Sequence, residues 1–118
     1  MRFVFDIDDT ISEWNDDRDY INFVPKPDMI FKINKLYDSG HYIILNTARG
    51  MMSANGNLDD INNRIRPPLE QWLINNNVKH HELIMGKPAG DYYIDDKNLS
   101  IDQFVNGEFE ANVYDWNN

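Results

Sequence analysis

The sequence has no cysteine among its 118 residues, no long hydrophobic run and few basic side chains. The lack of cysteine excludes disulfide scaffolds, thiolate zinc sites and cysteine nucleophiles. No segment approaches the roughly 18 consecutive apolar residues of a membrane span, and the N-terminus leads into a short apolar run instead of a signal-peptide pattern. We therefore expect a soluble, cytoplasmic protein without a membrane partner, whose chemistry depends on oxygen and nitrogen groups.

Acidic side chains outnumber basic ones by 20 to 11, which gives a formal net charge of −9. This balance repels a phosphate backbone at long range and disfavours a nucleic acid partner. Asp supplies 15 of the acidic residues, and its short carboxylate suits turns, helix N-caps and hard cations. A hydrophobic fraction of 42% supplies a core, and the length predicts a single domain over residues 1–118.

Short apolar runs alternate with segments of helical periodicity along the chain. Buried strands are predicted at residues 3–7, 42–45, 83–85 and 92–94, with a further edge strand within residues 107–118. Helices are predicted from Asp28 to Gly40, from Leu58 to Asn77 with a break near Pro67, and from Ser100 to Val105. Strand–helix–strand order implies right-handed parallel crossovers. We therefore predict an α/β fold, a Rossmann-like three-layer sandwich around a mainly parallel sheet.

Polar residues follow each of the four predicted inner strands. In chain order they are Asp6 with Asp8, then Thr47, Lys87, and Asp95 with Asp96. Ligands of open parallel sheets bind outside the carboxyl ends of the strands, so these exits converge on one crevice. Several carboxylates in one pocket repel one another unless they are protonated, paired or bound to metal, and an all-oxygen set favours Mg²⁺. The candidate Mg²⁺ ligands are Asp6, Asp8, Asp95 and Asp96, and Lys87 offers a fixed positive charge.

Four motifs at these exits resemble, in order, those of the haloacid dehalogenase superfamily of phosphohydrolases. They are Phe5-Asp6-Ile7-Asp8-Asp9-Thr10, Leu45-Asn46-Thr47, Lys87 and Ile94-Asp95-Asp96. The resemblance implies that Asp6 is a nucleophile that forms an aspartyl-phosphate and that Asp8 is the general acid and base. It also implies that Thr47 holds a phosphoryl oxygen, that Lys87 holds nucleophile and phosphate, and that Asp95 binds the metal with support from Asp96. Ala48 and Arg49, next to Thr47, are candidate substrate-binding residues, and a surface salt bridge is the alternative for Arg49.

The short spacings between these motifs leave no room for the cap domain that most members of the superfamily carry. The resemblance therefore implies a small capless member with an open site. Such a site admits large substrates or takes its lid from another subunit, a homo-oligomer or a partner protein. The expected substrate is a small phosphorylated compound, and the nearest resemblance is to capless members that process sugar phosphates.

The loop after the first motif has two interpretations. Trp14, Tyr20 and Phe23 are candidates for a platform that stacks on a sugar or base, or for the loop's own small core. Asp9 points away from its neighbours in an extended strand, which favours a structural role in the turn.

Three other functions are compatible with parts of the pattern. A signalling receiver domain also combines acidic residues, Thr, Lys and Mg²⁺ on a parallel sheet, but it needs an acceptor Asp on its third strand, where this chain has Gly86 and Lys87. The second is a non-catalytic module that binds Mg²⁺ or phosphate. The third is a nucleic acid end phosphatase, against which the acidic balance and the lack of a Lys/Arg run argue.

Overall fold

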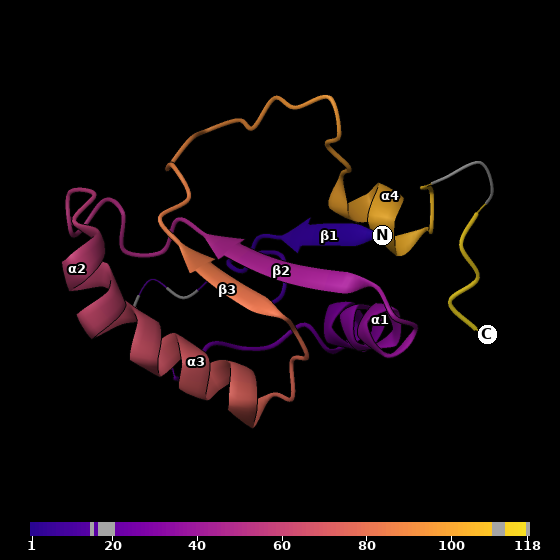
Figure 1. Ribbon diagram of the computed structural model, residues 1–118, viewed down its shortest axis with the longest axis horizontal. Coiled ribbons are helices and arrows are strands. Elements are labelled where there is room, and N and C mark those ends of the chain that lie inside the picture. The colour runs from indigo at the N-terminus through magenta and orange to yellow at the C-terminus, as the bar shows by residue number, and fades with distance from the viewer. Residues whose placement is uncertain (15, 17–20, 110–112, 118) are drawn as a thin grey trace.

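A parallel sheet of three strands organises the molecule. The computed structural model describes residues 1–14, 16, 21–109 and 113–117. The strands are β1 (Arg2–Phe5), β2 (Tyr42–Thr47) and β3 (Glu82–Met85), in the spatial order β1-β2-β3. Phe5 pairs with Leu45 and Thr47 pairs with Met85, so the carboxyl ends of all three strands lie at one edge of the sheet (Figure 1). This arrangement confirms the predicted Rossmann-like α/β class.

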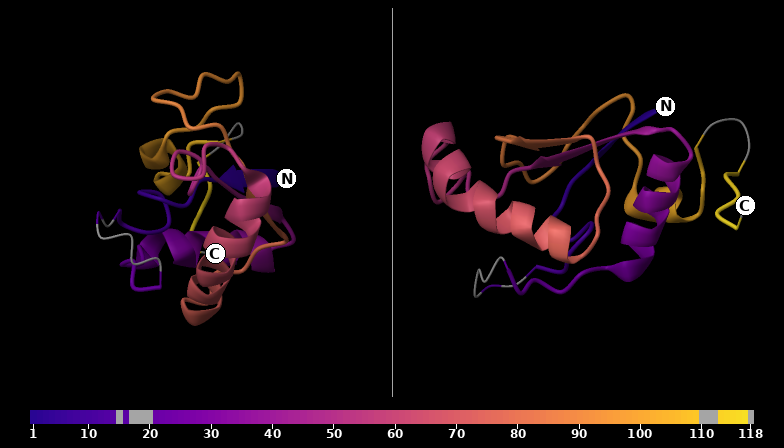
Figure 2. Two further views of the ribbon diagram at one scale, coloured as in Figure 1. Left: turned by 90° about the vertical axis from the view of Figure 1, so that its left-hand side faces the viewer. Right: turned by 60° about the horizontal axis from the view of Figure 1, so that its bottom comes forward.

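Two helices pack below the sheet in the view of Figure 1, and Figure 2 shows the same arrangement from other sides. The first, α1 (Pro27–Asp38), has Pro at its N-terminus and buries one face through Met29, Ile30, Ile33 and Leu36. The second, α3 (Arg66–Asn75), buries Leu69, Trp72 and Leu73. A short helix near β1, α4 (Ile101–Val105), begins with a capping box between Ser100 and Gln103. Each helix lies close to its predicted range.

The break expected near Pro67 is a change of helix type. The helix begins as α2 (Leu58–Asp60), widens into the π-helix η1 (Ile61–Ile65) and continues as α3. Proline has no N–H, and its ring clashes with the carbonyl four residues earlier in a regular α-helix. The wider turn before Pro67 and Pro68 accommodates both residues, so the chain stays helical through them.

The core lies between the sheet and the helices. Alternate strand residues point into it, namely Phe5, Ile43, Leu45, Leu83 and Met85, and the helices contribute the residues given above. The opposite face of the sheet is partly open, because Val4 is 62% exposed and Ile84 is 44% exposed. Among the described residues no helix is both long and apolar enough to cross a membrane.

Residues 88–99, which we call the arch, differ from the prediction. They run from the end of β3 out over the molecule to α4 and include no strand, so the strand predicted at residues 92–94 is wrong (Figure 1). Tyr92 is 87% exposed and Ile94 is 98% exposed, whereas a buried strand would enclose both. A run of three apolar residues forms a strand only where a neighbouring strand offers hydrogen bonds. The described part of residues 107–118 also forms no strand, and residues 110–112 and 118 lie outside it.

Candidate active site at the carboxyl ends of the strands

Asp6 and Asp8 line one pocket just beyond the end of β1. Between them, the fully buried Ile7 fixes the chain, and its carbonyl accepts hydrogen bonds from the backbone N–H groups of Ile11 (2.8 Å) and Thr10 (3.1 Å). Alternation along the extended chain then directs both carboxylates to the same side. The pocket has a volume of about 310 Å³. Its lining residues are Asp6, Asp8, Trp14, Ala48, Arg49, Gly50, Met52, Ser53 and Tyr93.

Arg49 reaches Asp8 from the end of β2. Its Nη2 lies 2.5 Å from Asp8 Oδ1 and its Nε lies 3.3 Å from Asp8 Oδ2, so the guanidinium binds the carboxylate through both oxygens. The Arg49 side chain is only 1% exposed, and its guanidinium carbon lies 4.9 Å from the ring centroid of the buried Phe23. The cation is therefore held by a carboxylate and an aromatic face within the protein interior.

The backbone turn that aims Arg49 depends on its two neighbours. Thr47 Oγ1 accepts a hydrogen bond from the backbone N–H of Arg49 at 3.0 Å. Gly50 follows with φ +83°, and a Cβ at this position would lie 2.9 Å from Cγ1 of Ile65. A larger residue would be strained in conformation and would clash, so glycine is required there.

Lys87 approaches Asp6 from the third strand. Its backbone N–H donates to the carbonyl of Thr47 at 3.1 Å, which continues the pairing of β2 with β3 by one residue. Its Nζ lies 3.8 Å from Asp6 Oδ1 and 4.0 Å from the ring centroid of Tyr93. The three strand ends thus bring two carboxylates and two cations together, as the sequence predicts for Asp6, Asp8 and Lys87.

Partial burial raises the pKa of the Asp6 carboxyl above its usual value. The nearby Asp8 carboxylate acts in the same direction, while a hydrogen bond from the Ile7 backbone and the charges of Lys87 and Arg49 oppose it. The net direction shows that removal from water outweighs the cations. A carboxylate of this kind is less well solvated than one on the surface and gains more from a new electrophilic partner.

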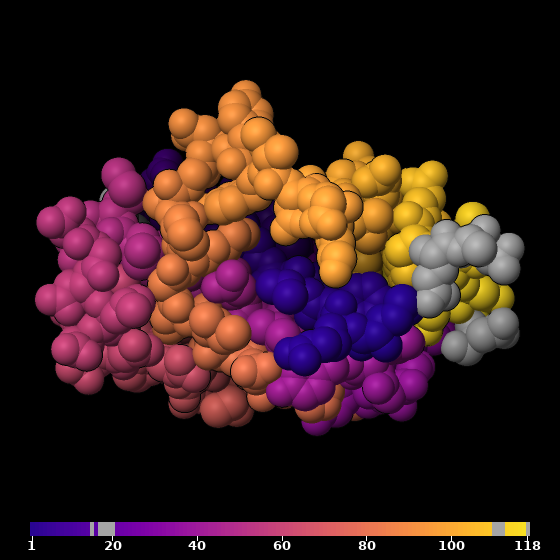
Figure 3. All heavy atoms as spheres, turned by 45° about the horizontal axis from the view of Figure 1, so that its top comes forward, coloured from indigo at the N-terminus to yellow at the C-terminus, as the bar shows by residue number. Residues whose placement is uncertain are grey.

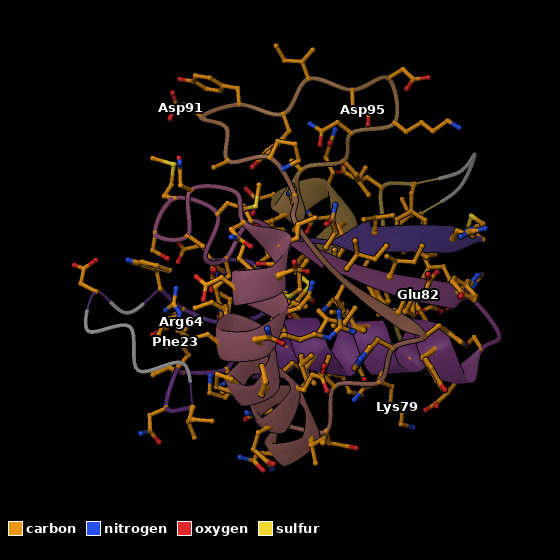
Figure 4. All side chains as sticks on the ribbon, turned by 60° about the vertical axis from the view of Figure 1, so that its left-hand side comes forward. Phe23, Arg64, Lys79, Glu82, Asp91 and Asp95 are labelled. Atoms are coloured by element: carbon orange, nitrogen blue, oxygen red, sulfur yellow. The ribbon has the colours of Figure 1, made fainter. Side chains whose placement is uncertain are left out.

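Of the other residues predicted for the site, two lie at the pocket and two lie on the arch. Ala48 lines the pocket, while Thr47 is fully buried beneath it and uses its hydroxyl on Arg49. Asp95 and Asp96 are exposed on the arch, and Figure 4 shows Asp95 away from the strand ends. Asp95 accepts a hydrogen bond from the backbone N–H of Lys97 at 2.9 Å, and this bond holds its pKa below the usual value. Its carboxylate therefore shapes a turn of the arch.

The described residues do not fit the complete Mg²⁺ site that the sequence predicts. Mg²⁺ takes near-octahedral oxygen ligands, and no group of three or more His, Asp or Glu side chains in the described part of the chain is arranged to hold a metal ion. Asp6 and Asp8 lie together but each faces a cation, and the other two expected ligands lie on the arch.

Several lining residues were not predicted as part of the site. Met52 and Ser53 follow the turn after Arg49, and their position just after the end of a strand could have indicated that they line the site. Tyr93 was assigned to a strand, but its hydroxyl donates to the Pro88 carbonyl at 2.6 Å and its ring borders the pocket. Of the three aromatic residues in the first loop, Trp14 lines the pocket, Phe23 is buried in the core, and Tyr20 lies outside the described residues.

Comparison with known proteins gives one strong structural likeness. A protein of known crystal structure from Vibrio cholerae is 31% identical in sequence, with a TM-score of 0.83 over 88% of this chain and 86% of that one. A D,D-heptose 1,7-bisphosphate phosphatase from B. bronchiseptica, crystallised with magnesium and phosphate, is 16% identical, with a TM-score of 0.47 over 82% of this chain and 53% of that one. No protein-family model and no curated protein matches the sequence.

Proposed function

We propose that this chain, which belongs to the same family as the Vibrio cholerae protein, is a phosphomonoesterase that works through a covalent aspartyl-phosphate on Asp6. The observation that carries the proposal is that two carboxylates are each paired with a cation at the pocket. Asp6 lies beside Lys87 and Asp8 is bound by Arg49, all at the carboxyl ends of parallel strands. The four ordered motifs that resemble the haloacid dehalogenase superfamily support the same reaction.

In the first step, an Asp6 carboxylate oxygen attacks phosphorus in line with the bond to the leaving oxygen. The P–O bond to the leaving group breaks, and Asp8, which enters this step carrying the proton that it takes from water in the second step of the preceding turnover, gives that proton to the leaving oxygen. Phosphoryl transfer depends chiefly on how the protein positions the reacting groups and neutralises their charge. Lys87, which already lies 3.8 Å from Asp6 Oδ1, is placed to neutralise phosphoryl oxygens as well as the nucleophile.

In the second step, water attacks the aspartyl-phosphate. Asp8, now ionised, takes a proton from the water, the acyl–phosphate P–O bond breaks, and Asp6 returns to its starting state. Acid and base catalysis by a single positioned group contributes about 10²–10⁴ in rate. Arg49 fixes the Asp8 carboxylate through both oxygens, and Ala48 lies beside them in the pocket wall. Thr47 orients Arg49 through the backbone.

Mg²⁺ dependence stays a prediction of the sequence. When bound, the ion would neutralise charge on the phosphoryl oxygens, which is its usual contribution to phosphoryl transfer. Asp95 and Asp96 lie on the arch outside the pocket lining and would bind the ion there only with the arch in another position.

The test is release of inorganic phosphate from p-nitrophenyl phosphate and from a panel of sugar and nucleoside monophosphates, with Mg²⁺ and with a chelator. We expect turnover by the wild-type protein and a loss of more than about a thousandfold in Asp6→Asn, because the amide is a poor nucleophile of the same size. Asp91→Asn, an acidic residue on the arch outside the pocket, is the matched control. Wild-type rates in Asp6→Asn would overturn the nucleophile assignment.

A second experiment separates the receiver-like alternative. A phosphatase hydrolyses its aspartyl-phosphate quickly, whereas a receiver domain retains it. After a small-molecule phosphodonor is added, we expect no phosphoprotein to accumulate in the wild type, as followed by intact-protein mass spectrometry. A stable mass increase of one phosphoryl group without turnover would favour the receiver.

A further inference from the structure

The rim of the pocket is aromatic and apolar, in contrast to its charged floor. Trp14, Met52 and Tyr93 all line the pocket, and they are 43%, 84% and 44% exposed. Exposed tryptophan at the mouth of a concave polar site is a common means of holding a ring. The space-filling view shows the molecule hollowed beneath the arch, beside the N-terminal residues (Figure 3).

Trp14 is held in place from three directions. Its backbone N–H donates to Asp9 Oδ1 at 3.0 Å, and its indole N–H donates to Asp16 Oδ1 at 2.7 Å. Its ring meets the buried Phe23 edge to face, with centroids 5.7 Å apart at 81°. A ring fixed in this way loses little freedom when a ligand covers it, so its contact contributes efficiently to affinity.

Asp9 is the residue that makes this arrangement possible. It has φ +59°, a conformation that is uncommon for a residue other than glycine and that Asp tolerates in turns. Its carbonyl also accepts a hydrogen bond from Lys26 Nζ at 2.8 Å. The unusual turn right after Asp8 thus places an aromatic ring beside the reacting carboxylates.

The charges in and beside the pocket limit what the leaving group can be. Among the described residues, Asp8 is paired with Arg49, which lines the pocket, and Asp6 is paired with Lys87, which lies beside it; the remaining lining residues are uncharged. The described rim offers no cation for a second phosphate or a carboxylate of the substrate. A volume of about 310 Å³ lies at the low end for small-molecule sites.

Resting on the proposed function, we infer that the substrate is the monophosphate of an uncharged alcohol with a single ring, of monosaccharide size, whose ring lies against the indole of Trp14. The phosphate then lies against both Asp6 and Lys87, and the ring extends past Met52 toward the solvent. Trp14 is a specificity residue, since it contacts the leaving group and not the phosphoryl group.

The experiment compares kcat/KM for glucose 6-phosphate, which has a ring, with that for glycerol 3-phosphate, which has none. In the wild type we expect a preference for the ring substrate, and in Trp14→Ala we expect this preference to fall about fivefold, mainly through KM. Trp14→Phe should recover most of it. Phe31→Ala removes an aromatic ring that is 56% exposed and does not line this pocket, and it should leave the preference unchanged.

An equal fall for both substrates in Trp14→Ala, or no fall for either, would overturn the inference. A Trp14-dependent preference for adenosine 5′-monophosphate or fructose 1,6-bisphosphate over glucose 6-phosphate would overturn the inference that the leaving group has a single ring and no charge. Binding of cyclohexylmethylphosphonate and propylphosphonate, measured by calorimetry, keeps the test independent of turnover. Trp14-dependent preference for the cyclic phosphonate without any hydrolysis would contradict the proposed function alone, and binding of neither would contradict the inference as well.

Discussion

The strand ends and the arch carry the same kind of residue in opposite surroundings. Asp6 and Asp8 lie in a pocket and each faces a cation, with Arg49 almost fully buried behind them. Asp95 and Asp96 are exposed, and Asp95 binds only the backbone of its own turn and its neighbour. Figure 4 shows Asp91 and Asp95 on the arch, well apart from the sheet. Paired carboxylates in a motif acquire a chemical role only where the fold supplies partners for them.

The largest expected difference between the two regions is in turnover. Asp8→Asn should lower kcat by about 10²–10⁴, because it removes the proton donor and acceptor. Asp91→Asn on the arch should change kcat by less than about twofold. Both variants are compared in the phosphate-release assay after circular dichroism has established that they are folded.

Equal activity of Asp8→Asn and Asp91→Asn would remove the contrast. The kcat of Asp95→Asn sharpens the contrast, because it should resemble that of either Asp8→Asn or Asp91→Asn. A deep loss would show that the arch carries a functional carboxylate, and titration with Mg²⁺ would then show whether metal affinity is what was lost.

The second prediction concerns the buried ion pair. Arg49→Met leaves Asp8 without its partner and should lower the free energy of unfolding by about 3 kcal/mol, the low end for such pairs because Asp8 is partly solvated. Arg64→Met, which breaks an exposed pair with Asp60 in the helix, should lower the free energy of unfolding far less, because water screens this pair. Urea denaturation measures both, and similar losses would show that burial does not distinguish the two pairs.

The third prediction concerns the hydroxyl beneath the pocket. Thr47→Val leaves the backbone N–H of Arg49 without its acceptor and should cost about 1–3 kcal/mol of stability. Thr47→Ser keeps the oxygen and should cost less. If the two variants are equally stable, Thr47 contributes packing and not a hydrogen bond.

The smallest expected effect is on the pH dependence of stability in metal-free buffer. The raised pKa of Asp6 means that the folded protein binds this proton more tightly than the unfolded chain does. Its contribution to stability is therefore fully present below the unfolded pKa of about 3.9 and is lost as the pH rises through the folded pKa. Relative to the wild type, Asp6→Asn should gain stability between acidic pH and pH 7, as followed by urea denaturation. A constant difference across this range would contradict the shift.

The sequence predicts the three strands and the closeness of Asp6, Asp8 and Lys87 because both depend on local patterns. Apolar runs that end in polar residues mark buried parallel strands, and parallel strands place their ends at one edge. Asp6, Asp8 and Lys87 follow directly from this rule. The predicted turn at Asp9 also agrees with its positive φ and its bond to Trp14.

The features that the sequence does not reveal depend on distant partners. Arg49 and Asp8 are 41 residues apart, and only the packed fold shows that the pair is buried over Phe23. Trp14 and Phe23 lie in the same loop with similar chemistry, yet one lines the pocket and the other fills the core. Residues 92–94 have the composition of a strand but no strand beside them, so tertiary context outweighs propensity.

The position of Phe23 links catalytic competence to the integrity of the fold. Its carbonyl accepts a hydrogen bond from the indole N–H of Trp72 at 2.7 Å, and its ring supports both Arg49 and Trp14. One residue therefore contacts the packed helix α3, the arginine that binds the proposed general acid–base Asp8, and the tryptophan of the proposed ring contact. Heat inactivation of this protein should thus coincide with unfolding. Substitutions in the first loop that change specificity will be limited by Phe23, because the same residue packs in the core.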